Sequence, residues 1–153
     1  MKKKNILIAC ESSGTIREAF NIRGHNAMSC DLLDTDIPGN HHKGDVLPLL
    51  KMKWDLIVAH PPCTFLCNSG VRWLVKNGVI QTDRYEEMIK AAIFFKEFLK
   101  YDGRVIIENP IPHKYALHQI GVKYSQIIQP WMFGHGETKA TCFWLKGVKL
   151  IRA

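Results

Sequence analysis

The sequence predicts an α/β protein built on a doubly wound, mostly parallel sheet with an antiparallel C-terminal edge. Three continuous aliphatic runs, at Asn5–Cys10, Leu56–His60 and Val105–Glu108, are typical of strands covered on both faces. Helical patterns separate the runs, and such alternation gives right-handed crossovers and a parallel sheet. A chain of 153 residues can bury a core of its own, and we expect residues 1–153 to form one domain.

Each remaining element has a local reason. His25–Asp31 is predicted as a fourth strand, and Thr15–Arg23 as a helix that follows a Ser-Ser-Gly turn and ends before Gly24. Thr82–Tyr101 begins with a Thr/Asp cap and has an apolar stripe at helical spacing, which fits core packing. The stripe consists of Met88, Ala92, Phe95 and Leu99.

The C-terminal third predicts the antiparallel edge. Ser125–Pro130 and Ala140–Leu145 are two β-rich runs that flank a segment rich in aromatic, glycine and polar residues. Their connection is longer than a tight hairpin turn. We therefore expect two strands joined by a sizeable loop at one side of the sheet.

The composition points to a protein of a reducing compartment with a polyanionic partner. No apolar stretch approaches the roughly 20 residues that span a bilayer, so we expect a cytoplasmic protein without a membrane partner. The five cysteines are an odd number without a disulfide pattern, which predicts free thiols, most of them buried. The net charge of +7 makes nucleic acid the leading candidate partner.

The segment with the clearest chemistry is the exit of the predicted strand Leu56–His60. Two prolines end the strand, and Cys63 follows on a stiff loop at the sheet edge where open α/β folds bind ligands. A cysteine is a nucleophile once its pKa is lowered and the thiolate is accessible. His60, Cys63 and Cys67 lack a second ligand cluster, so we expect no metal site.

Glu108 is the second candidate for chemistry. It directly follows an apolar run, and partial desolvation there is expected to raise its pKa. Such a carboxyl can act as an acid or as a hydrogen-bond partner for a ring nitrogen. The alternative is a helix cap or a loop ion pair.

Three more features lie at strand ends. The loop Glu11–Gly14 lets backbone amides approach a ligand, although a tight connection would use the same small residues. Asp31 ends a predicted strand, where acids often hold ribose hydroxyls, and Asp45 could meet an adenine amino group. Each acid alone is more typical of a turn or cap, and their combination favours a nucleotide-like cofactor.

In this order the motifs resemble those of the DNA cytosine-C5 methyltransferases, which use S-adenosylmethionine. The chain is still more similar to short phage and prophage proteins of this type. The resemblance covers residues 5–110 and rests on Glu11–Gly14, Asp31, Gly44-Asp-Val46, Pro61-Pro-Cys63 and Glu108-Asn-Pro110. It implies a Rossmann-like methyltransferase fold, methyl transfer to C5 of cytosine in DNA, and flipping of the target base out of a duplex.

The resemblance also implies the site residues. Cys63 would attack C6 while Glu108 holds N3, with Pro62 and Asn109 completing the catalytic motifs. The cofactor residues would be Glu11, Ser12, Ser13, Gly14, Asp31, Asp45 and Pro61. The substrate residues would be Arg72, Trp131, His135, Lys139 and Thr141.

The chain departs from the family pattern in five places, one of which is that the closing helical motif beside the cofactor is missing. The first loop has one glycine, Pro110 stands where the family has valine, and the Gln-x-Arg-x-Arg element is replaced by a run at His135–Thr141. No room remains for a separate target-recognition domain, so a homodimer or a partner protein would supply specificity. Two alternatives stay open: a catalytically incomplete binder of a nucleotide, nucleic acid or protein, and an enzyme acting on a free pyrimidine nucleotide.

The segment Trp131–Thr141 has two interpretations. Trp131 and Phe133 could stack on a base while His135, Lys139 and Thr141 meet phosphate. Alternatively, the segment is part of an edge hairpin whose aromatic side chains pack against the last helix. Likewise, Arg72 and the following Trp73 are either substrate contacts or a solvated arginine beside a core tryptophan, and His41 and His42 are expected in an exposed loop.

Overall fold

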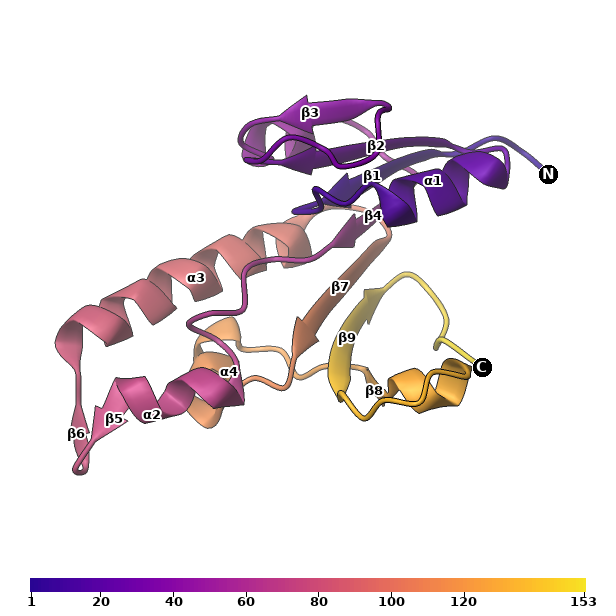
Figure 1. Cartoon of the computed structure of the whole chain (residues 1–153). Helices are drawn as coiled ribbons and strands as arrows, with labels where there is room; N and C mark the ends of the chain where they lie inside the picture. Colours follow the sequence, from indigo (N-terminus) through magenta and orange to yellow (C-terminus); the bar gives the residue numbers. More distant parts are fainter.

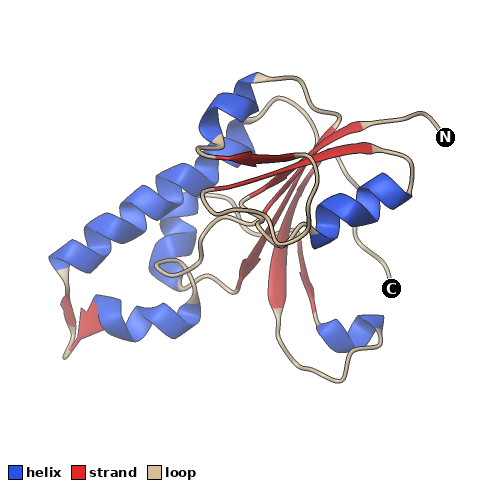
Figure 2. Ribbon diagram, turned by 45° about the horizontal axis from the view of Figure 1, so that its top comes forward, coloured by secondary structure: helices blue, strands red, loops and turns tan.

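A computed structural model describes all residues, 1–153, as a seven-stranded sheet with helices on both faces (Figures 1 and 2). The strands of the sheet are β1 (Asn5–Ala9), β2 (Asn26–Asp31), β3 (His41–Lys43), β4 (Leu56–Ala59), β7 (Val105–Pro110), β8 (Gln126–Ile128) and β9 (Thr141–Lys146). Their spatial order is β3-β2-β1-β4-β7-β9-β8, and β9 runs antiparallel to both of its neighbours. The predicted fold class is therefore confirmed.

The reversed strand lies inside the sheet rather than at its edge. β9 is placed between β7 and β8, so β8 forms the edge. Burial explains this order, because β9 carries the buried side chains Cys142 and Trp144, whereas Ile127 of β8 is exposed. The Trp144 indole also donates a hydrogen bond of 2.8 Å to the Val122 carbonyl, which fixes β9 against the chain that leads into β8.

Helices cover the two faces unequally. The helices are α1 (Thr15–Ile22), α2 (Val71–Leu74), α3 (Thr82–Lys100) and α4 (Lys114–Ile120), and there are three short 3-10 helices, η1 (Leu47–Lys51), η2 (Asn68–Gly70) and η3 (Pro130–Phe133). α1 packs over a small cluster on one face, which consists of Ile6, Ile8, Ala27 and Val58. α3 and α4 pack on the other face over the larger core (Figure 1). A small separate hairpin, β5 (Val75–Lys76) and β6 (Val79–Ile80), joins α2 to α3.

The apolar stripe of α3 faces the sheet, as its spacing predicts. Met88, Ala92 and Phe95 are buried, but the fourth fully buried position is Phe98, with Leu99 only partly buried. The Phe95 ring packs edge-to-face on Trp144 at a centroid distance of 4.8 Å. Burying one such side chain stabilises a fold by about 1.5–3 kcal/mol, so this contact anchors α3 to β9. No helix in the structure has the length and apolar character needed to cross a membrane.

The assignment of His41 and His42 to a loop was wrong, although His42 is exposed as expected. Both lie in β3, which pairs with β2 in parallel. His41 is held by its ring, whose Nδ1 lies 2.8 Å from Ser29 Oγ and whose Nε2 lies 2.9 Å from the Leu33 carbonyl. These side-chain hydrogen bonds stabilise a short, polar strand that buries little apolar surface.

A buried arginine ties this region to α1. Arg17 is fully buried, and its guanidinium donates to Ser29 Oγ at 2.8 Å, to Thr35 Oγ1 at 3.2 Å and to the Ile37 carbonyl at 2.5 Å. Its Nε also pairs with Glu18 at 2.9 Å. Because a buried charge needs such partners, Arg17 fixes the path of the segment between β2 and β3.

Candidate active site

The β4 exit is held rigidly against both neighbouring strands. The backbone N–H of His60 donates to the Ala9 carbonyl of β1 at 2.9 Å. On the other side, Asn109 of β7 is buried and donates from Nδ2 to the Pro61 carbonyl at 2.8 Å. Asn109, a predicted catalytic residue, therefore positions the Pro61-Pro62 turn through its amide group, and Pro61 is itself buried.

Cys63 follows this turn in a half-buried position. Its carbonyl accepts hydrogen bonds from the backbone N–H groups of Leu66 and Cys67 at 2.9 and 3.0 Å, which fixes the turn that carries the thiol. Burial raises the pKa of the Cys63 thiol, and the neighbouring Cys67 and Glu108 raise it further. The resting group is thus a thiol, whereas the nucleophilic role calls for a lowered pKa.

Glu108 of β7 is gripped at both carboxylate oxygens. Oε2 lies 3.0 Å from His60 Nδ1, and Oε1 accepts a short hydrogen bond from the Thr141 hydroxyl of β9. Burial opposes ionisation of Glu108, but the bonds from His60 and Thr141 and the nearby charges of His60 and Lys139 outweigh it, so the pKa is lowered. The expected raised pKa was wrong, because the neighbouring strands supply donors that the local sequence does not reveal.

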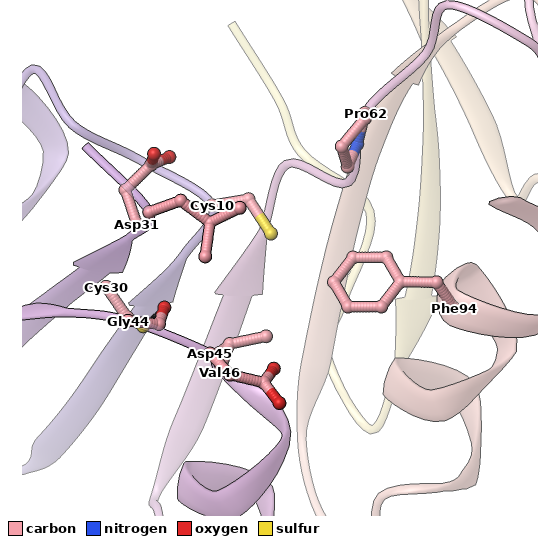
Figure 3. A pocket seen from close by; sticks show the side chains of 9 residues that line it. Cys10, Cys30, Asp31, Gly44, Asp45, Val46, Pro62 and Phe94 are labelled. Atoms are coloured by element: carbon pink, nitrogen blue, oxygen red, sulfur yellow. Dashed lines mark hydrogen bonds between the residues drawn. The ribbon is translucent and has the colours of Figure 1, made fainter.

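A pocket of about 160 Å³ opens beside the carboxyl ends of β1 and β2 (Figure 3). Its lining consists of Cys10, Cys30, Asp31, Leu32, Gly44, Asp45, Val46, Pro62 and Phe94. Figure 3 shows the Phe94 ring of α3 facing the strand-end residues across the pocket, with Pro62 on the same side as the ring. The structure therefore brings the predicted residues Asp31 and Asp45 together and places Pro62 beside them.

Each pocket acid has one oxygen free of protein partners. Asp31 Oδ1 accepts from the backbone N–H of Leu33 at 3.0 Å, and Asp45 Oδ1 accepts from that of Leu47 at 3.0 Å. These are the turn and cap roles that remained as alternatives, and each uses a single oxygen. The second oxygen of each carboxylate remains available to a ligand.

The first loop hydrogen-bonds to the start of α1 and also contains a carboxylate oxygen without a partner. Glu11 Oε1 accepts from the backbone N–H of Ile16 at 2.9 Å and from the Ser13 hydroxyl at 2.8 Å, while its Oε2 is buried without a partner. Gly14 has a φ of +78° and is buried, and Ser12 is half-buried. The loop therefore stabilises the start of α1, and Oε2 of Glu11 remains available as a hydrogen-bond acceptor.

Cys63 and Glu108 lie outside the lining of this pocket. Pro62 connects the two groups, because it lines the pocket and immediately precedes Cys63. Glu108 in turn acts electrostatically on Cys63. The candidate site therefore has two adjoining halves, which we call the acid pocket (Asp31, Asp45) and the Cys–Glu pair (Cys63, Glu108).

Two of the predicted substrate residues, Thr141 and Lys139, lie near Glu108, and the other three, Arg72, Trp131 and His135, are exposed. Thr141 binds Glu108 and Lys139 acts on its charge, so both belong to the surroundings of the carboxylate. Trp131, on η3, is 56% exposed, and His135 lies in the exposed loop that follows. The interpretation of packed hairpin aromatics is therefore wrong, because η3 turns its aromatic side chains to solvent.

Arg72 lies on α2, which follows the Cys63 turn. Its guanidinium carbon lies 5.0 Å from the centre of the Trp73 ring, and Trp73 is 49% exposed. The interpretation of Trp73 as a core residue is therefore wrong. In Figure 1, the α2–β5–β6 region and η3 flank the carboxyl end of β7 on opposite sides.

Three residues at the candidate site had no clear signal in the sequence. Cys10 lines the acid pocket with a φ of +59°, and burial raises its pKa to about 12, so it is a packed thiol rather than a nucleophile. Phe94 reaches the pocket from a helix whose stripe predicts only core residues. His60, which precedes Cys63 by three residues, pairs with Glu108.

Comparison with known proteins identifies the fold. No protein-family model and no curated protein matches the chain. Among solved structures, WbdD bound to the kinase inhibitor LY294002 superposes with a TM-score of 0.50 and 9% identity over 94% of this chain and 36% of that chain. A 2.2 Å structure of WbdD gives a TM-score of 0.50 and 10% identity over 93% and 35%.

A further match is the magnesium protoporphyrin IX methyltransferase ChlM from Synechocystis PCC 6803 with bound SAM, with a TM-score of 0.47 and 11% identity over 95% and 71% of the two chains. WbdD is described as a bifunctional kinase-methyltransferase, and this chain spans about a third of its length. Likeness at such low identity shows the fold and not the reaction. The chain has the Rossmann-like fold of methyltransferases.

Proposed function

We propose that this protein transfers a methyl group from S-adenosylmethionine to C5 of cytosine in DNA. The observation that carries the proposal is the junction at Pro62, where the acid pocket adjoins the Cys–Glu pair. A methyltransferase needs a cofactor site and a reactive group side by side. The motif resemblance and the methyltransferase fold support the same assignment.

The acid pocket fits the adenosine end of the cofactor. The free oxygen of Asp31 would accept hydrogen bonds from the ribose hydroxyls, and that of Asp45 from the adenine amino group. The pocket volume of about 160 Å³ suits one end of such a ligand, with Phe94 against it. This leaves the methionine end to the first loop.

The first loop offers the groups that the methionine end requires. The buried, unpartnered Oε2 of Glu11 would accept a hydrogen bond from the ammonium group. Ser12, Ser13 and Gly14 would line the rest of the site for the methionine end. Pro61 would complete the cofactor site. When bound, the sulfonium supplies the methyl group.

The Cys–Glu pair would activate the base. The Cys63 S–H bond breaks as its sulfur bonds C6, the proton passes to the Glu108 carboxylate, and Glu108 delivers it to N3. The C5=C6 electrons thereby make C5 nucleophilic toward the sulfonium methyl. Loss of the C5 proton to solvent then restores C5=C6 and breaks the sulfur–C6 bond, and the N3 proton returns through Glu108 to Cys63.

The DNA substrate would lie over the surface that surrounds the Cys–Glu pair. Exposed Trp131 can stack on a base, and Arg72, His135 and Lys139 can meet phosphates. A base in a duplex would have to be flipped out to reach Cys63. A second copy of the chain or a separate partner would supply the sequence specificity.

The test is transfer of labelled methyl groups to DNA. Cys63→Ser should abolish incorporation, while Thr64→Ala, which changes an exposed side chain on the same turn, should retain most of it if circular dichroism shows that both variants fold. Equal incorporation by wild type and Cys63→Ser would refute the covalent mechanism. Digestion to nucleosides should place the label on 5-methylcytosine.

One observation favours a second candidate, a methyltransferase-like binder that does not methylate. Cys63 has a raised pKa, and Glu108 already has partners at both oxygens. Such a site could hold a nucleotide, nucleic acid or protein without activating a base. Cofactor binding in calorimetry, with no transfer to DNA, RNA or cytidine nucleotides, would favour this candidate.

A further inference from the structure

His60 and Glu108 form a hydrogen-bonded pair that the motif resemblance does not explain. His60 extends from the end of β4 and Glu108 from β7, with 3.0 Å between Nδ1 and Oε2. An ionised carboxylate can only accept, so Nδ1 is the donor. The two side chains are 24% and 27% exposed, which leaves them within reach of a ligand while their contact is largely shielded.

The pair belongs to a network across three adjacent strands. β9 supplies the Thr141 hydroxyl, which donates to the other carboxylate oxygen of Glu108. The same hydroxyl lies 3.4 Å from the Asn109 carbonyl of β7. With one donor on each oxygen, the Glu108 carboxylate has a fixed orientation, and only its remaining lone pairs can meet a substrate.

Titratable side chains near Glu108 come from β4, from the turn after β4, and from β9 and the loop before it. His60 of β4 and Lys139, before β9, favour the ionised form, whereas burial disfavours it. The negative charge of Glu108 also raises the pKa of the Cys63 and Cys142 thiols. In the resting site the proton therefore lies on Cys63 and the negative charge on Glu108.

We propose that His60 is a positioning residue that keeps Glu108 ionised and oriented until a base arrives, so that Glu108 can collect the proton of the Cys63 thiol. The inference rests on the proposed function. Nδ1 donates to Oε2 throughout, and the proton from sulfur goes to the Glu108 carboxylate and then to the ring nitrogen. His60 thereby sets the lowest pH at which Glu108 can act as the base.

Two variants separate this role from a purely structural one. His60→Ala removes the donor, while His60→Asn places an amide N–H close to the position of Nδ1. His118→Ala on α4 is the control for loss of an imidazole elsewhere. Each variant is first checked for a native circular dichroism spectrum.

The first measurement needs neither cofactor nor DNA. The Glu108 carboxyl carbon is titrated by NMR in uniformly labelled protein, with Glu108→Gln to assign its signal. In His60→Ala the Glu108 pKa should rise by about one unit, because the hydrogen bond to Oε2 is lost. His60→Asn should recover part of the shift, and His118→Ala should show none.

The second measurement is the pH profile of methyl transfer. Glu108 accepts a proton only when ionised, so the rate falls as pH drops through its pKa. A raised pKa in His60→Ala moves this acid limb to higher pH, and His60→Asn moves it back. An unchanged Glu108 pKa and acid limb in His60→Ala would overturn the inference.

The two measurements separate this inference from the proposed function. If the wild type transfers no methyl group, the proposed function fails, and the NMR titration still decides whether His60 controls the Glu108 carboxylate. If transfer is normal and the titration shows no response to His60→Ala, the inference alone fails.

Discussion

Asp31 shows how a single side chain can serve the fold and still leave one oxygen available to a ligand. Its Oδ1 accepts from Leu33 N–H, and its other oxygen faces no protein donor. A cofactor with adjacent hydroxyls would satisfy that oxygen, and hydrogen bonds to a charged group contribute about 1.5–3 kcal/mol. The same reasoning applies to Asp45.

Asp31→Ala should weaken S-adenosylmethionine binding by about 10- to 100-fold, because hydrogen bonds of that strength are lost. Isothermal titration calorimetry measures the change. Asp34→Ala is the matched control, since Asp34 lies in the same segment and pairs with Lys43 at the surface. Equal affinity of Asp31→Ala and wild type would contradict the assignment of this pocket.

Residues at strand ends were predictable because their position follows from the sheet. Cys63, Glu108 and Asp31 each lie at or just after the end of a predicted strand, and parallel strands bring such exits to one edge. Their protonation was not predictable. It depends on donors such as His60 and Thr141, which lie 48 and 33 positions away from Glu108 in the sequence.

At the scale of elements, the first loop and α1 depend on a crowded glycine. A Cβ at Gly14 would lie 2.8 Å from Arg17 Nη2 and 3.0 Å from Ile37 Cβ, at a φ of +78°. The buried guanidinium is fixed by its own hydrogen bonds and cannot move aside freely. Gly14 therefore couples the cofactor loop to the network of Arg17.

Gly14→Ala should destabilise the protein more than Gly24→Ala. Both glycines have positive φ, where strain costs about 1–2 kcal/mol, but a Cβ at Gly24 meets nothing within 4 Å. The crowding at Gly14 should add to that cost. Urea unfolding of both variants provides the comparison, and equal loss of stability would contradict the proposed coupling.

Long, apolar elements were predicted to within one or two residues at most ends, because burial on both faces leaves a continuous signal. α3, for example, was expected at Thr82–Tyr101 and spans Thr82–Lys100. Short polar elements were missed. β3 depends on His41 contacts and α4 on a cap in which His113 Nδ1 accepts from Ala116 N–H, and neither leaves an apolar period.

At the scale of the whole molecule, the excess of positive charge would draw nucleic acid toward the site. The net charge is +7, and exposed Lys139 lies near Glu108. Phosphate contacts release counterions, so affinity for DNA falls steeply with salt. The proposed DNA surface therefore predicts a salt-dependent affinity.

Lys139→Ala should reduce the slope of log K against log salt by about one unit, the expected effect of one lost phosphate contact. Fluorescence anisotropy with a labelled duplex measures the slope. Lys90→Ala is the control, because Lys90 is already paired with Glu87 at 2.9 Å. Identical slopes for wild type and Lys139→Ala would exclude Lys139 from the DNA surface.

The central claim is that Cys63 bonds to C6 of cytosine, and trapping that bond tests it most directly. With 5-fluorocytosine in the DNA, C5 carries no proton to lose, so the adduct should persist once the methyl group is transferred. Mass spectrometry after digestion should then find the base attached to the peptide that contains Cys63. An unmodified Cys63 peptide, in protein that binds both cofactor and DNA, would contradict the account.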